Sequence, residues 1–240
     1  MSRVPTPRLV GVLAPPDIVS LINAGLGFGS VVLAAAGDVE NAARLVLLAG
    51  IADGVDGILA RHGPTSEIGT ELDSLCDAVS FGIAPAFLIY VISRPLGRVS
   101  YVPIVFVLAA VVRLAVYNVY DSETRSFRGV PSTLSSVIVA TLYLTGATTN
   151  IGVGTPVALV VLSVVFSYLM LTGIRYPELK KEHAVSMGVV MVLAALFPDY
   201  LGSVFGYTLL SFLGAYLMFS PWFYEGAQET EGSGSSEEVG

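Results

Sequence analysis

The chain has 240 residues, of which 54% are hydrophobic and only 13% charged, and its formal net charge is -7. Apolar runs near 20 residues long continue over most of the length, which indicates a polytopic membrane protein with helical spans, because lipid offers backbone groups no water. The acidic balance, with Lys180 and Lys181 as the only lysines, argues against nucleic acid as a partner, and the single cysteine, Cys76, excludes an intramolecular disulfide.

The apolar runs predict about eight helical spans. In chain order these are residues 16–36, 42–61, 69–92, 99–120, 131–147, 155–174, 183–196 and 200–219. The last two are the least regular, since the seventh is short for a crossing of about 20 residues and Pro198 interrupts the pair. We therefore expect an all-α transmembrane helix bundle.

Three parts of unequal size follow from this pattern. Residues 1–15 form a short arm with several prolines, residues 16–224 form the transmembrane domain, and residues 225–240 form an acidic tail rich in Gly and Ser that we expect to be disordered. The first span ends in three alanines that resemble a signal-peptide cleavage site. Its apolar run exceeds the usual length of about 7 to 15 residues, so a retained helix is favoured.

The distribution of cations predicts the orientation. With the N-terminus in the cytoplasm, nine of the twelve cations lie at cytoplasmic ends: Arg3, Arg8, Arg61, Arg113, Arg125, Arg128, Arg175, Lys180 and Lys181. Arg44, Arg94 and Arg98 lie outside. This excess of positive charge inside is typical of membrane proteins. It places the connection between residues 61 and 69 at the cytoplasmic face of a cell-membrane protein.

Acidic residues gather on both sides of that connection. At 100° per residue, one helical face within about 140° carries Asp53, Asp56, Gly57, Ala60 and Arg61. On the next helix, Gly69, Asp73 and Asp77 are spaced by four and form a second stripe, whereas Glu71 points away from it. The short connection lets the two helices run antiparallel with their stripes facing each other.

Four carboxylates this close together at membrane depth require their negative charge to be compensated. Each would cost several kcal/mol in desolvation unless it were protonated or neutralised, and two divalent ions would balance four negative charges. Oxygen ligands favour hard ions such as Mg²⁺, Mn²⁺ or Ca²⁺. Gly57 and Ala60 leave room for a ligand between the helices, and the forked donor of Arg61 suits phosphate.

Two other interpretations of these residues are open. Gly57 and Ala60 could form a helix-packing face, with Arg61 reaching to the interface and the acids paired with basic side chains. The carboxylates could instead line a cation or proton pathway, although such a pathway would thread polar residues through the membrane rather than gather them near one side. A buried ionisable group in a membrane most commonly marks a functional site.

The pattern D-x-x-D-G-x-x-A-R-x7-G-x-x-x-D-x-x-x-D resembles the signature of the CDP-alcohol phosphatidyltransferase family at all eight fixed positions. The stretch 71–85 is similar to the membrane-embedded phosphatidylserine synthases, which usually carry Ala in place of Cys76. Four further segments are similar to that subgroup: Ser20-x-x-Asn23-x-x-x-Gly27, 113–118, 127–132 and 175–177. The resemblance covers about residues 16–180, with departures at Asp17, usually Asn, and at Val116, usually Arg.

This resemblance implies that an alcohol displaces CMP from CDP-diacylglycerol or CDP-archaeol in the membrane. It implies two metal ions, Mg or Mn with Ca possible, held by Asp53, Asp56 and Asp73, with Asp77 as the general base that shares the second ion. Gly57, Ala60, Arg61 and Gly69 would shape the nucleotide pocket. Family analogy also implies a homodimer.

L-serine is the acceptor that the subgroup implies. Arg113, Asn118 and Arg128 are the candidate acceptor residues, since a cation there could hold the serine carboxylate, although both arginines could serve orientation alone. Glycerol phosphate or an inositol phosphate would require an extra basic cluster, and the scarcity of Lys and Arg favours serine. We expect His62 and His183 to lie in interfacial loops and Cys76 to be a packing residue.

Overall fold

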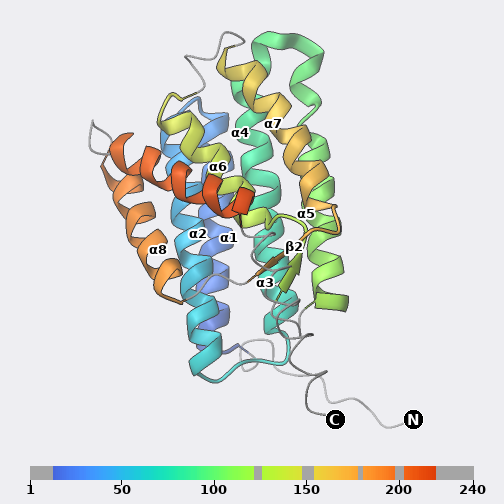
Figure 1. Ribbon diagram of the computed structural model, residues 1–240, viewed down its shortest axis with the longest axis vertical. Coiled ribbons are helices and arrows are strands. Elements are labelled where there is room, and N and C mark those ends of the chain that lie inside the picture. Colours follow the sequence, from blue (N-terminus) through green and yellow to red (C-terminus); the bar gives the residue numbers. More distant parts are fainter. Residues whose placement is uncertain (1–12, 122–125, 148–153, 178–180, 198–202, 220–240) are drawn as a thin grey trace, which may run out of the picture.

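The apolar runs form helices that stand side by side in one bundle (Figure 1). The computed structural model describes residues 13–121, 126–147, 154–177, 181–197 and 203–219. Nearly all of the expected N-terminal arm and the whole acidic tail therefore lie outside the described residues. Where the structure describes the chain, each of the eight predicted spans is helical, so their helical character is confirmed.

The first half of the chain holds the longest helices. α1 spans Pro15–Ala35 and α2 spans Val39–His62. A third, continuous helical segment consists of α3 (Gly69–Asp77), the π-helical turn η2 (Ala78–Ile83) and α4 (Ala84–Ser93), and the 3-10 turn η3 (Arg94–Tyr101) follows it. A π-turn widens the helix locally and often marks a functional site. Here it begins directly after Asp77.

The second half adds shorter helices. α5 spans Ile104–Val116 and continues into the π-turn η4 (Tyr117–Asp121), followed by α6 (Ser132–Leu144), α7 (Thr155–Met170), α8 (Lys181–Leu196) and a helix over Ser203–Phe219. The helix Ser203–Phe219, at the red end of the colour scale, runs across the direction of α1 and α2 (Figure 1).

A small antiparallel ladder is the one departure from all-α structure within the described residues. β1 (Ser126–Arg128) pairs with β2 (Arg175–Pro177), so that Phe127 lies opposite Tyr176. The sequence did not predict this ladder, because three residues are too few to show the alternation that marks a strand. It joins the connection after η4 to the connection after α7 and packs against η4.

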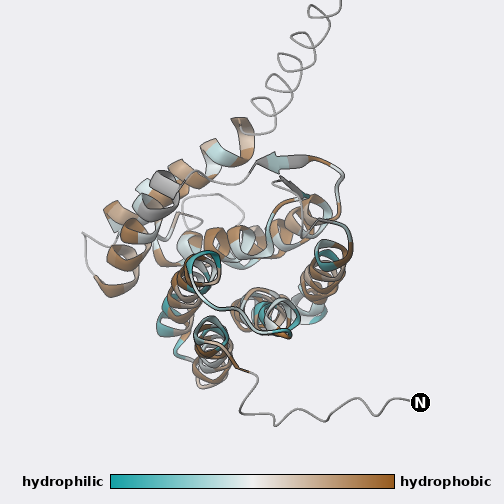
Figure 2. Ribbon diagram, turned by 90° about the horizontal axis from the view of Figure 1, so that it is seen from below, coloured by the Kyte–Doolittle hydropathy of each residue, from teal (hydrophilic) through white to brown (hydrophobic). Residues whose placement is uncertain are grey.

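Among the residues that the structure describes, two helical segments are long and apolar enough to cross a membrane, namely Pro15–Ala35 and Gly69–Tyr101. α2 has 24 residues but is not among them, because charged residues are spread along it. Apolar stretches predominate when the bundle is seen along its helices (Figure 2). Large exposed apolar side chains lie on α1, α5 and α7, including Ile18, Ile22, Phe28, Val32, Ile104, Leu108, Val111, Val112, Val161, Val164 and Val165. Such a surface is compatible with a membrane bundle.

One end of the bundle gathers the segments that the sequence singled out. α1 begins, α2 ends and α3 begins at the lower end in Figure 1, and α5 ends there as well. α1 packs against α2, α3 and η2, while α5 packs against η2. α1 and the turn η4 thus pack against the short acidic helix α3, while α5 packs against the turn η2 that continues it.

The contact between α1 and η2 depends on Gly27. A Cβ at this position would lie 2.5 Å from Ser80 Oγ and 2.6 Å from Ser80 Cα, which no side chain could accommodate without a shift of backbone. The close approach lets the Ser80 hydroxyl donate a 2.8 Å hydrogen bond to the backbone carbonyl of Asn23. Gly27 therefore fixes the depth at which α1 meets the turn after Asp77.

Substitution of Gly27 by alanine should destabilise the protein by about 1 to 3 kcal/mol, the usual cost of overpacking. Gly25→Ala is a matched control on the same helix, because nothing lies within 4 Å of a Cβ at that position. This control should be neutral or slightly stabilising, since alanine favours a helix. Thermal unfolding of both variants in detergent measures the difference, and equal midpoints would contradict the packing at Gly27.

Candidate active site

Three aspartates from two helices form an acidic cluster. Asp53 and Asp56 on α2 and Asp73 on α3 each offer a carboxylate oxygen, and these three atoms lie within 4.8 Å of one another. Asp56 is buried, with 5% of its surface exposed. The two stripes therefore face each other across the α2–α3 connection, as the helical spacing predicts.

Asp77 lies one turn beyond Asp73 on the same helix and is 7% exposed. Its side chain lies beside that of Asp53, and Thr133 of α6 lies beside Asp53 as well. All four predicted carboxylates thus share one site. Its walls come from α2, α3 and α6.

Two side chains of α1 hold the carboxylates in place. Ser20 Oγ donates to Asp56 Oδ2 at 2.9 Å, and Asn23 Nδ2 donates to Asp77 Oδ1 at 3.0 Å. Both donors are buried. From the sequence, Ser20 and Asn23 are predicted as part of the family resemblance but not as site residues. The available signal was their spacing of three, which puts two polar side chains on one face of an apolar helix.

The donor set fits a divalent metal. Asp73 Oδ1 is buried and has no hydrogen-bond partner among the residues that the structure describes. A buried carboxylate oxygen without a partner is costly, and hard cations such as Mg²⁺ and Mn²⁺ prefer such ligands. Asp53, Asp56 and Asp73 are therefore the candidate ligands, with Asp77 adjacent to them.

The residues predicted for the nucleotide pocket follow the same face of α2 towards its end. Gly57 is half-buried, while Ala60 and Arg61 are exposed. A Cβ on Gly57 would meet only Arg61 Nη2, at 4.0 Å, so no packing contact requires glycine there. Gly57 and Ala60 leave an open surface beside the acidic cluster, with the Arg61 guanidinium at its edge.

Gly69 has a different environment, at the start of α3. A Cβ at this position would lie 3.2 Å from Asp17 Oδ1 and 3.4 Å from Ser66 Oγ. Asp17 is buried, and its other oxygen accepts a 2.6 Å hydrogen bond from the backbone N–H of Ala14 at the start of α1. The small size of Gly69 thus lets the first turns of α1 and α3 pack together, a role that the sequence did not indicate.

The three candidate acceptor residues lie on α5, η4 and β1, which follow one another in the chain. Arg113 on α5 is buried, donates from Nη1 to Ser132 Oγ at 3.1 Å, and lies close enough to Asp77 for its charge to act on that carboxylate. Asn118 in η4 accepts a 2.9 Å hydrogen bond from Ser74 Oγ, one turn before Asp77. Arg128 is exposed on β1, beside η4. Arg113 and Asn118 thus adjoin the helix that carries Asp77, whereas the contact described for Arg128 is that of its strand β1 with η4.

The remaining residues singled out from the sequence lie apart from the cluster or pack beside it. His62 is exposed at the end of α2, where its Nδ1 contacts the Ile58 carbonyl at 2.9 Å. Cys76 is buried, and Glu71 is exposed on α3. The side chain of His183 lies outside the described residues.

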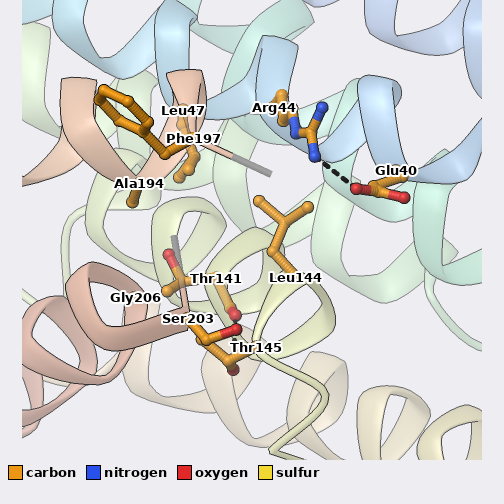
Figure 3. A pocket seen from close by; sticks show the side chains of 10 residues that line it. All are labelled: Glu40, Arg44, Leu47, Thr141, Leu144, Thr145, Ala194, Phe197, Ser203 and Gly206. Atoms are coloured by element: carbon orange, nitrogen blue, oxygen red, sulfur yellow. Dashed lines mark hydrogen bonds and ion pairs between the residues drawn. The ribbon is translucent and has the colours of Figure 1, made fainter. Parts of the chain in front are cut away.

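A small cavity of about 20 Å³ lies elsewhere, between α2, α6, α8 and the helix Ser203–Phe219 (Figure 3). The ion pair of Arg44 with Glu40 lines it, together with Thr141 and Thr145. Arg44 precedes Asp53 by nine residues, or about 13 Å along α2. The cavity has room for about one water molecule and is separate from the acidic cluster.

The class of protein follows from the sequence profile of the CDP-alcohol phosphatidyltransferase family, which matches residues 13–169. The chain belongs to this family and is a phosphotransferase enzyme of phospholipid biosynthesis. The matched region begins just before α1 and ends within α7, so it contains the whole acidic cluster. The family resemblance seen in the sequence is confirmed.

Individual relatives are similar over most of their length. The archaetidylserine synthase of Methanothermobacter thermautotrophicus is 33% identical over 176 residues, which are 71% of this chain and 72% of the relative. The CDP-diacylglycerol--serine O-phosphatidyltransferase of Helicobacter pylori strain J99 is 32% identical over 179 residues, or 69% of this chain and 73% of the relative. The enzyme of the same name from Mycobacterium leprae is 30% identical over 210 residues, with 82% and 69% covered.

Proposed function

We propose that this enzyme transfers the phosphatidyl or archaetidyl group of a CDP-lipid to the hydroxyl of L-serine and releases CMP. The observation that carries the reaction type is the cluster of Asp53, Asp56 and Asp73, with carboxylate oxygens within 4.8 Å, in a member of this family. The choice of serine rests on the names of the relatives.

Asp53, Asp56 and Asp73 would hold two divalent ions, Mg²⁺ or Mn²⁺ with Ca²⁺ as a further candidate, and Asp77 would share the second ion. Such ions neutralise the charge of the diphosphate and stabilise the leaving CMP. The buried, unpartnered Asp73 Oδ1 supports this assignment. Ser20 orients Asp56 through its hydrogen bond, so that the carboxylate keeps a fixed direction when a cation binds.

Asp77 would act as the general base. Its carboxylate takes the proton of the serine hydroxyl while the serine oxygen bonds to the phosphorus that carries the lipid, and the bond from that phosphorus to CMP breaks. The 3.0 Å hydrogen bond from Asn23 holds Oδ1 of Asp77. The carboxylate therefore keeps one orientation, which general-base catalysis requires.

The CDP-lipid would bind along the end of α2 and the start of α3. Gly57 and Ala60 leave space for the nucleotide, Arg61 offers donors to its phosphates, and Gly69 lets the backbone of α3 come close. Arg113, Asn118 and Arg128 would bind the acceptor. Arg113 is placed best for the serine carboxylate, because it is buried and acts on Asp77.

The bundle would be an integral cell-membrane protein with eight spans, a cytoplasmic N-terminus and an active site that faces the cytoplasm. The exposed apolar side chains of α1, α5 and α7 and the excess of cations at one end support this placement. Serine and CMP could then exchange with the cytosol while the lipid stays in the bilayer. A homodimer is proposed by analogy with the family.

Release of CMP tests the proposal directly. Purified protein in detergent receives CDP-diacylglycerol or CDP-archaeol, Mg²⁺ or Mn²⁺, and one of a panel of alcohols that contains L-serine, glycerol 3-phosphate and inositol 1-phosphate. We expect CMP release with serine and a loss of activity on chelation of the metal.

The same panel separates the alternatives. CMP release with a phosphorylated alcohol but not with serine would keep the reaction type and change the acceptor. If no alcohol releases CMP while ion flux into proteoliposomes depends on Asp53 and Asp73, the transferase assignment is wrong.

A further inference from the structure

Asn23 is a fully buried polar residue of α1. The residue is 0% exposed, its amide nitrogen donates to Asp77 Oδ1 at 3.0 Å, and its backbone carbonyl accepts the hydroxyl of Ser80 at 2.8 Å. Gly27, one turn further on, makes this contact with η2 possible. The side chain and the backbone of Asn23 are therefore both held in place relative to Asp77.

The other half of the Asn23 amide has no such partner. Oδ1 of Asn23 is buried and lacks a hydrogen-bond donor among the described residues. Standard amide bond lengths put this oxygen about 2.2 Å from Nδ2, hence within about 5 Å of Asp77 Oδ1. Buried side-chain acceptors in folded proteins nearly always have a donor, and leaving one without costs its desolvation. The structure thus presents a fixed acceptor beside the proposed general base.

The chemistry of the reactants decides which donor fits. Phosphate oxygens of a CDP-lipid only accept hydrogen bonds, so they cannot satisfy an amide oxygen. The cytosine amino group and the ribose hydroxyls are donors, but the proposed nucleotide pocket puts them along the end of α2, beside Gly57 and Ala60, rather than at Asp77. In serine the ammonium nitrogen and the hydroxyl oxygen are two carbons apart, so a serine whose hydroxyl meets Asp77 brings its ammonium within reach of a group a few ångströms away. A neutral amide also accepts from a cation without adding a fifth negative charge to the cluster.

We propose that Asn23 Oδ1 accepts a hydrogen bond from the ammonium group of the acceptor and makes Asn23 a specificity residue for amino alcohols. This rests on the proposed function, since it takes serine as the acceptor. It divides recognition of serine between two helices, with the ammonium on α1 and the carboxylate on α5.

The test compares L-serine with 3-hydroxypropanoate, which keeps the hydroxyl and the carboxylate but lacks the amino group. In the wild-type enzyme we expect kcat/KM to favour serine by at least about 100-fold, because a site built to bond a polar group rejects the analogue that lacks it. Asn23→Leu has a similar shape but neither donor nor acceptor, and it should reduce this preference by about 10-fold or more. Ser30→Ala, which alters another buried α1 side chain that donates to the Ala42 carbonyl, should leave the preference unchanged.

A second variant separates specificity from positioning. Asn23→Asp keeps an acceptor for the ammonium but loses the amide donor to Asp77, so kcat should fall while KM for serine stays within about 3-fold of the wild-type value. This variant decides the question if Asn23→Leu fails to fold.

An equal loss with both acceptors in Asn23→Leu, or a large rise in KM for serine in Asn23→Asp, would overturn the proposal and leave Asn23 as a positioning residue for Asp77. A wild-type enzyme that releases CMP with another alcohol but not with serine would instead overturn the proposed function, and this inference with it.

Discussion

Replacement of Asp77 by asparagine is expected to lower kcat by at least about 100-fold, the lower end of the usual contribution of a general base. Binding of the CDP-lipid should persist. Asparagine has nearly the shape of aspartate, and its Oδ1 can still accept the 3.0 Å hydrogen bond from Asn23, so the local packing is retained. What is lost is the carboxylate that takes the proton.

Two measurements on Asp77→Asn separate chemistry from binding. CMP release in the presence of serine gives kcat, and calorimetric titration of the CDP-lipid in detergent with Mg²⁺ gives the affinity. Glu71→Gln is the matched control, because Glu71 is an exposed acid on the same helix. Turnover near the wild-type rate would remove Asp77 from the base role. Loss of CDP-lipid binding together with turnover would show that Asp77 serves chiefly as a metal ligand.

The acidic cluster was predictable because its geometry is local. Spacings of three and four along a helix put Asp53 with Asp56, and Asp73 with Asp77, on one face each. Because the connection between the two helices is short, these two faces lie close together. The helices were predictable for the same reason, since the length and composition of an apolar run depend on no distant residue.

The supporting contacts were not predictable because they join distant parts of the chain. The bond from Asn23 to Asp77 spans 54 residues, and that from Ser20 to Asp56 spans 36. Both depend on how deeply α1 packs against η2, which the glycine at position 27 determines. The π-turn itself leaves no periodic signal in six residues, so sequence patterns predicted an uninterrupted helix there.

Gly57 and Gly69 have different roles in the structure, and the sequence could not distinguish them for the same reason. The sequence placed Gly57 and Gly69 in one pocket, since both are small and both lie in the signature. In the structure a Cβ on Gly57 would meet only Arg61 Nη2, at 4.0 Å, whereas a Cβ on Gly69 would lie 3.2 Å from Asp17 Oδ1. Only the position of α1 distinguishes them, and spacing along α2 and α3 carries no information about α1.

The substitution Asp73→Asn should change the unfolding temperature in opposite directions with and without a divalent metal in the buffer. In the presence of a chelator, the variant should unfold at a higher temperature than the wild type. In saturating Mg²⁺ the order should be reversed. One substitution with two opposite signs is a stringent test of a cluster built to hold cations.

The reversal follows from the charge of the cluster. Without a cation, each pair of ionised carboxylates about 4 Å apart repels by about 4 kcal/mol at an effective dielectric constant of about 20, so removal of one charge relieves strain. With Mg²⁺ at 100 times its dissociation constant, binding stabilises the wild type by about 2.7 kcal/mol, and the variant forgoes most of this because it lacks a ligand. For a chain of this length each kcal/mol corresponds to about 2 to 4 °C.

Thermal unfolding in detergent, measured for both proteins across a Mg²⁺ titration, gives the two signs without recourse to activity. Glu71→Gln again serves as the control, since it removes one charge from α3 outside the cluster and should shift both midpoints equally. If Asp73→Asn is less stable than the wild type at every Mg²⁺ concentration, the aspartate has a structural partner and the acids are not held together by a metal. If Mg²⁺ stabilises both proteins alike, the metal lies elsewhere and the cluster of Asp53, Asp56 and Asp73 is not its site.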